Sequence, residues 1–191
     1  MKQIDFDHGT VTGNILGVAL PMLVAQILSL LYNIVDRIYI ARIPSVGTTA
    51  LGAVGLCFPI IVIITAFSNL FGSGGAPLFS INRGKGNIKK AEVIMNTSFS
   101  MLCICGVTLM VIGMLFASPI LVLFGASEEG LSYAYPYMMI YLIGTVPSMI
   151  ATGMNPFINA QGYATSGMLS VTIGAVANLI LDPLFIFGLN L

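Results

Sequence analysis

The sequence predicts an all-α membrane protein, a polytopic bundle of about five transmembrane helices. Two observations support this fold class. Hydrophobic residues make up 57% of the 191 residues and charged residues only 7%, whereas a soluble domain carries roughly 25% charged residues. The segments from Gly9 to Val35 and from Gly130 to Leu181 contain no Asp, Glu, Lys or Arg. Uncharged segments of this length are typical of helices that cross a lipid bilayer, so lipid is an expected partner.

Charges, Gly and Pro clusters and turn residues divide the sequence into five apolar runs. We place the spans near residues 14–40, 51–78, 93–117, 131–155 and 166–187. Each run has at least about 20 residues, enough for a helix to cross a hydrocarbon core of about 30 Å. Residues 1–191 are therefore expected to form one transmembrane lobe, and the sequence looks as if a sixth span were missing.

The loop after the second span sets the expected orientation. Four of the seven basic residues, Arg83, Lys85, Lys89 and Lys90, lie in this loop, and Lys2 is expected on the same side of the membrane. Short loops rich in Lys and Arg stay in the cytoplasm. We therefore expect a cytoplasmic N-terminus, with the odd-numbered spans running outward.

Composition also excludes several classes of function. The net charge is zero and no basic tract is present, so nucleic acid is not an expected partner. Cys57, Cys103 and Cys105 lie in apolar runs without a CxxC pair, and we interpret them as small buried hydrophobes rather than metal ligands. The glycine-rich segment Gly72–Ala76 lies within a span and follows no strand, so it indicates close helix packing rather than a nucleotide loop. No cofactor is expected.

Two carboxylates interrupt the apolar runs, Asp36 in the first span and Asp182 in the fifth. A carboxylate at membrane depth is costly unless it is paired, hydrated or protonated, so each marks a hypothetical functional site. Each acid lies about three-quarters of the way along an outward-running span, which predicts similar depths. Two such groups in one cavity suit reversible protonation or cation binding. The alternative is that each is an interfacial residue at a helix end.

Polar residues accompany Asp36 along the first span. Gln26, Ser29, Asn33 and Asp36 follow one another at steps of three or four, which places them on one face of a helix. A polar stripe of this kind in a bilayer must face protein or water. We therefore expect this face to line a cavity.

The fifth span shows a similar arrangement. Gly174, Asn178 and Asp182 are spaced by four, so Asn178 is expected to hydrogen-bond Asp182. Pro183 has no N–H and is expected to bend the helix, leaving the carbonyl of Leu179 free beside the carboxylate.

Three further residues are candidates for the cavity with an alternative role open for each. Asn155 either reaches the cavity or caps its helix. Tyr32 and Tyr137 either line an aromatic cavity or anchor their helices at the membrane interface.

Several segments, taken in order along the chain, resemble the multidrug and toxic compound extrusion (MATE) family. These segments are Pro21 followed by Tyr32-Asn33-Ile34-Val35-Asp36, Gly72-Ser73-Gly74-Gly75-Ala76-Pro77 leading to Arg83-Gly84-Lys85-Gly86-Asn87, Asn155-Pro156 with Ala160-Gln161-Gly162, and Asn178-Leu179-Ile180-Leu181-Asp182-Pro183. The last element looks like the branch named for DNA-damage-inducible proteins. The resemblance covers the whole chain as the first five helices of a twelve-helix protein built from two six-helix lobes.

The resemblance implies a cation-coupled multidrug efflux antiporter without enzymatic activity, driven by H+ or Na+ entry. Asp36, Asn178 and Asp182 would form the cation site, with Asn155 and Tyr32 as further members, and Pro21 matches a helix-bending proline. Expected substrates are small cationic or amphipathic organic molecules, and the expected location is the plasma (inner) membrane of a bacterial or archaeal cell. The missing C-terminal lobe would be the chain's partner.

Three alternative functions remain open. A lipid-linked sugar flippase shares the architecture but favours a basic cavity, to which these spans contribute little beyond Arg37. An inactive or interaction-only fragment is the second alternative. An intramembrane aspartyl protease also uses two embedded acids, but its Tyr-Asp and Gly-x-Gly-Asp motifs differ from Val35-Asp36-Arg37 and Leu181-Asp182-Pro183.

Overall fold

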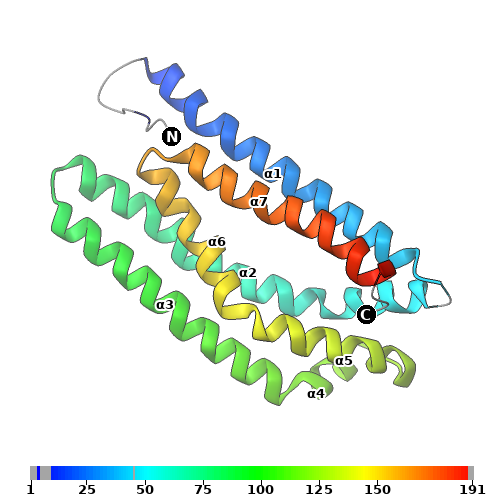
Figure 1. Ribbon diagram of the computed structural model, residues 1–191. Coiled ribbons are helices and arrows are strands. Elements are labelled where there is room, and N and C mark those ends of the chain that lie inside the picture. Colours follow the sequence, from blue (N-terminus) through cyan, green and yellow to red (C-terminus); the bar gives the residue numbers. More distant parts are fainter. Residues whose placement is uncertain (1–3, 5–9, 45, 189–191) are drawn as a thin grey trace. The chain divides into compact units, whose positions relative to one another are not determined.

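The computed structural model describes residues 4, 10–44 and 46–188, and within them it confirms the all-helical fold (Figure 1). Four segments are each long and apolar enough to cross a membrane, and a bent helix pair would make a fifth span. The four segments are α1 (Val11–Ala41), α2 (Gly47–Gly84), α3 (Ile88–Leu115) and Ala164–Ile186. The chain divides into two compact units, residues 1–45 with 157–191 and residues 46–156. We describe each unit separately, as unit 1 and unit 2.

Unit 1 is built on two helices, α1 (Val11–Ala41) and α7 (Ala164–Pro183), which pack along each other and run in the same direction (Figure 1). The Oγ1 of Thr10 accepts a hydrogen bond from the N–H of Gly13 at 3.2 Å, which satisfies a donor that the first helical turn leaves without an intrahelical acceptor. The N–H of Ile4 donates to the carbonyl of Gly162 at 3.0 Å. Helix α1 has no buried residue, so its apolar surface suits contact with lipid.

Unit 2 contains α2 (Gly47–Gly84), α3 (Ile88–Leu115), α4 (Ala117–Leu123), α5 (Glu128–Ile143) and most of α6 (Thr145–Ala160). Helices α2 and α3 form an antiparallel hairpin, and α5 packs against both (Figure 1). Short helix α4 is not among the predicted spans.

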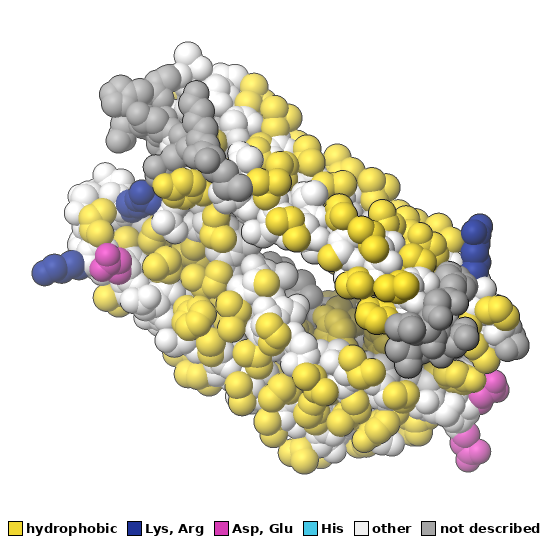
Figure 2. All heavy atoms as spheres, viewed as in Figure 1, with side chains coloured by type: hydrophobic (Ala, Val, Ile, Leu, Met, Phe, Trp, Pro, Cys, Tyr) yellow, Lys and Arg dark blue, Asp and Glu magenta, His cyan; other side chains and the backbone are white. Residues whose placement is uncertain are grey.

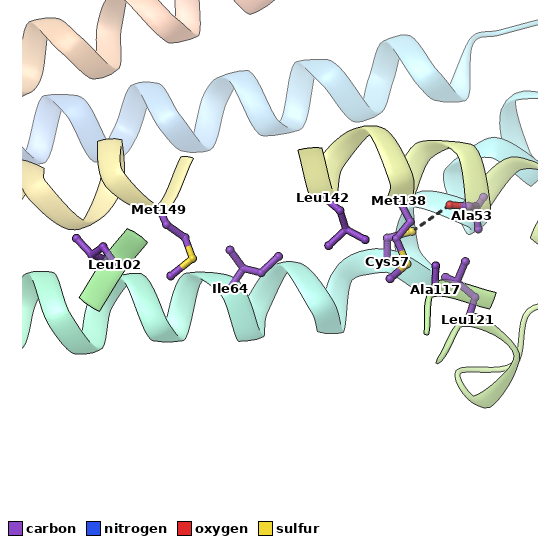
Figure 3. Close-up of a cluster of buried hydrophobic side chains, with 10 residues drawn as sticks. Ala53, Cys57, Ile64, Leu102, Ala117, Leu121, Met138, Leu142 and Met149 are labelled. Carbon is purple, nitrogen blue, oxygen red and sulfur yellow. Dashed lines mark hydrogen bonds between the residues drawn. The ribbon is translucent and has the colours of Figure 1, made fainter. Parts of the chain in front are cut away.

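A buried apolar cluster holds unit 2 together (Figure 3). The side chains of Leu102, Leu121 and Leu142 are fully buried in it. Cys57 is also buried, and its thiol lies 3.6 Å from the carbonyl oxygen of Ala134, to which it donates a hydrogen bond. The interpretation as a small buried group is therefore confirmed for Cys57, whereas Cys103 and Cys105 are only partly buried.

The glycine-rich segment of α2 makes a close helix crossing within unit 2. A Cβ added at Gly72 would clash with the backbone carbonyl of Gly153 in α6. A Cβ added at Gly153 would lie 2.6 Å from both methyl carbons of Leu102 in α3. Gly72, Gly75 and Ala76 are buried, as expected for a segment that lets helix backbones approach closely.

The fourth predicted span, residues 131–155, is not one continuous helix. Its residues belong to α5 and α6, which meet at Gly144 and are bent by 55°. Pro147 is compatible with the start of a helix here. Proline cannot donate to the carbonyl four residues earlier, but it is tolerated in the first turn, where that donor has no intrahelical partner. The N–H of Ser148 then donates to Gly144 at 3.0 Å, which continues the new helix.

Candidate cation site

The acidic pair lies toward the C-terminal ends of α1 and α7, within unit 1. Because the two helices are parallel neighbours, Asp36 and Asp182 come close enough for their charges to interact, although they are far apart in sequence. The guanidinium of Arg37 is a further charge that acts on Asp36. Both carboxylates are partly buried. The structure therefore brings together the two acids that interrupt the apolar sequence.

Two neighbouring carboxylates repel each other, and water screens this repulsion poorly at membrane depth. A proton on one acid, or a cation between the two, removes the repulsion. Within the described residues no group of three or more His, Cys, Asp or Glu could hold a metal ion. A bound cation would therefore have to complete its ligand set with neutral oxygen atoms, which hard cations accept readily.

The helix changes type directly beside Asp182. Pro183 has no N–H to donate to the carbonyl of Leu179. The N–H of Leu184 instead donates to the carbonyl of Leu181, and Leu184–Gly188 continue as a π-helical turn, η1. The helix is thus irregular at this proline, whereas the free carbonyl of Leu179 stays a prediction. Single π-helical turns occur frequently at functional sites, and the sequence did not predict this one.

The polar residues of α1 are partly engaged with their own helix. The side-chain amide of Asn33 donates to the carbonyl of Ser29 at 2.7 Å. Gln26 and Asn33 are exposed, whereas Tyr32 is partly buried. Pro21 lies inside α1. A contribution of Gln26, Tyr32 and Asn33 to a cavity stays a prediction.

Asn178 lies one helical turn before Asp182 on α7, and its side chain is exposed. Among the hydrogen bonds of the described residues, the expected bond between Asn178 and Asp182 does not occur. The amide oxygen of Asn178 is a neutral oxygen ligand of the kind a cation would need. Its role as a ligand stays a prediction.

The remaining candidates belong to unit 2. Tyr137 is partly buried against the apolar cluster and stacks on Tyr141, with ring centroids 6.5 Å apart and an interplanar angle of 23°. Asn155 lies inside α6 and precedes Pro156. The stacked pair is a feature that the sequence signals only through its spacing of four residues, which places both rings on one face of α5.

Comparison with known proteins shows the same family along most of the chain. The MatE family model matches residues 21–184. The chain is 30% identical over 187 residues to the FAD transporter of Shewanella oneidensis, covering 96% of this chain and 41% of that protein. It is 28% identical over 186 residues to the multidrug export protein MepA of Staphylococcus haemolyticus, covering 97% of this chain and 41% of that protein.

Solved structures agree with this assignment. A MATE transporter crystallised in complex with MaD5 superposes with a TM-score of 0.90 at 25% identity, over 99% of this chain and 42% of that one. An outward-facing multidrug resistance MATE transporter gives a TM-score of 0.85 at 26% identity, over 92% of this chain and 38% of that one. The chain thus spans about two-fifths of the length of these relatives. It is a multi-pass membrane protein that belongs to the MATE family of transporters.

Proposed function

We propose that the chain supplies the cation-binding part of an antiporter that exports small organic molecules against entry of H+ or Na+. The observation that carries the proposal is the packing of α1 along α7, which brings Asp36 and Asp182 within range of each other's charge. The family membership and the multidrug export protein MepA among its relatives support the substrate class. The part of these relatives that the chain does not cover would correspond to the second lobe.

The proposed coupling follows from the electrostatics of the pair. With the site empty, the two carboxylates repel each other across the α1–α7 contact. A proton or Na+ at the site removes that repulsion and lets the helix ends pack more closely. Cation entry would thereby change the packing of α1 against α7 and lower the affinity of the transporter for its organic substrate.

The proposal places the protein in the plasma membrane of a bacterial or archaeal cell, with the turn between α2 and α3 in the cytoplasm. Arg83, Lys85, Lys89 and Lys90 at this turn support the orientation. Lys2, which was expected on the same side, lies outside the described residues.

The test is efflux by the full-length protein reconstituted in vesicles, with ethidium as the cationic probe and an imposed H+ or Na+ gradient. Asp182→Asn and Asp36→Asn should each abolish gradient-driven ethidium movement, and the double variant should be no worse than either single one. Glu92→Gln removes an exposed carboxylate from α3 and is the matched control. Size-exclusion profiles would verify folding. Full gradient-dependent efflux by a correctly folded Asp182→Asn protein would overturn the proposed site.

A second candidate substrate is FAD, because the Shewanella oneidensis relative is an FAD transporter. FAD carries phosphates and is anionic, so it differs in charge from the first substrate class. The same vesicles would be assayed for FAD movement. Transport of FAD without transport of ethidium would replace the multidrug substrate class and leave the cation site unaffected.

A further inference from the structure

The turn that joins α2 to α3 carries an unusual concentration of positive charge. Figure 2 shows dark blue Lys and Arg side chains projecting from this end of unit 2. Residues 82–92 contain four basic residues and one acid, Glu92. Their local net charge is therefore +3, in a chain of zero net charge. We call residues Arg83–Lys90 the basic turn.

The backbone of the basic turn is fixed by hydrogen bonds. Gly86 has a φ of +75°, its N–H donates to the carbonyl of Arg83 at 3.0 Å, and the N–H of Asn87 donates to the carbonyl of Asn82 at 2.9 Å. This pair of bonds is the Schellman arrangement that ends a helix. Asn87 also begins α3, because its side-chain oxygen accepts from the N–H of Lys90 at 3.2 Å. The lysines therefore project from a hydrogen-bonded turn that caps both helices.

Two of the lysines occupy positions that α3 itself disfavours. Lys89 and Lys90 lie in the first helical turn, which contains no acidic residue. The N-terminus of a helix carries partial positive charge, so lysines there are repelled by the helix dipole as well as by each other. An anion at this position would relieve the repulsion, and the first-turn N–H groups other than that of Lys90, which donates to Asn87, are suitable donors for a phosphate.

Apolar side chains flank the basic turn on both helices. Ile81 on α2 and Ile88 and Val93 on α3 are each at least half exposed. The turn connects two helices that are long and apolar enough to cross a membrane, so it lies at a bilayer surface. Exposed apolar groups suit the acyl region there, and exposed lysines suit the headgroup layer.

We propose that the basic turn is a binding surface for the phosphate headgroups of anionic phospholipids. The positive charge and the helix N-terminus suit any phosphate, whereas the flanking exposed apolar groups and the position between two membrane-spanning helices favour a lipid over a free anion. Basic residues near an anionic leaflet each strengthen attraction severalfold. The inference does not depend on the transported substrate or on the coupling ion.

The test is native mass spectrometry of the detergent-solubilised full-length protein titrated with dioleoylphosphatidylglycerol or dioleoylphosphatidylcholine. The wild type should retain phosphatidylglycerol in preference to phosphatidylcholine. The triple variant Lys85→Gln, Lys89→Gln, Lys90→Gln should lose this preference, because three of the four positive charges of the basic turn are removed. The three side chains are exposed, so the variant should fold, which circular dichroism would verify.

The control is the triple Lys→Arg variant, which keeps the charge and should keep the preference for phosphatidylglycerol. Equal binding of phosphatidylglycerol by the wild type and the Lys→Gln variant would overturn the proposal. A competition arm with glycerol phosphate separates the two sources of phosphate. Displacement of the lipid by equimolar glycerol phosphate would show a site for free phosphate and would also overturn the proposal.

Discussion

The close crossing of α2 and α6 gives a sharp prediction for stability, centred on Gly72→Ala. An alanine Cβ at this position would lie 2.9 Å from the Cα of Gly153 and 3.0 Å from its carbonyl carbon, and closer still to the carbonyl oxygen. All three contacts are with backbone, which cannot rotate away. Gly74, two residues along the same helix, has no atom within 4 Å of an added Cβ and provides the matched control.

The magnitude follows from these contacts. Carbon atoms pack best at about 3.5–4.0 Å, so α2 and α6 would have to separate by roughly 0.5–1 Å. Overpacking of this kind lowers the free energy of unfolding by about 1–3 kcal/mol. Gly74→Ala should instead raise it by roughly 0.5–1 kcal/mol, because alanine has less conformational entropy to lose in a helix. The free energy of unfolding of Gly153→Ala should lie between those of these two variants, since the nearest atoms to its added Cβ belong to the end of the Leu102 side chain.

The assay is thermal unfolding of the full-length variants in detergent, followed by the loss of the monodisperse size-exclusion peak. The expected order of apparent Tm is Gly74→Ala, then wild type, then Gly153→Ala, then Gly72→Ala, with several degrees between the extremes. A Gly72→Ala protein as stable as Gly74→Ala would refute the close crossing. That result would show that α2 and α6 do not approach at these glycines.

Three further predictions can be tested in the same preparations. Gly86→Ala should lower the free energy of unfolding by about 1–2 kcal/mol, because an L-residue is disfavoured at a φ of +75°, and stability equal to the wild type would contradict the left-handed turn. Leu142→Ala should lower the free energy of unfolding by about 2–5 kcal/mol, because the side chain is fully buried. Leu123 is 80% exposed, so Leu123→Ala should change the free energy of unfolding by less than about 0.5 kcal/mol. Equal effects of the two variants would contradict the assigned core. Cys57 should resist a water-soluble maleimide until the protein unfolds, because only 2% of its surface is exposed; rapid labelling of the folded protein would contradict its burial.

Local pattern accounts for the parts of the fold that could be predicted. Long uncharged runs predict helices across a bilayer, and the glycine segment that starts at Gly72 predicts close packing, because both depend on neighbours in sequence. The break at Gly144 could not be predicted in this way. Pro147 is compatible both with a kink in one span and with the start of a new helix, and the packing of α5 and α6 decides between them.

The candidate site likewise combines features that the sequence predicts with features that depend on the packing of the helices. The sequence by itself determined that the chain lies in a membrane and that Asp36 and Asp182 are costly there, because the energy of a charge in lipid depends on the residue and its depth. Only the tertiary structure decided that these acids come within range of each other's charge, since this requires α1 and α7 to pack as parallel neighbours. The exposure of Asn178 and the partners of Gly72 and Leu102 also depend on contacts between distant segments. Helical periodicity fixes the face on which a residue lies, but which helix lies opposite that face is set by packing across the whole chain.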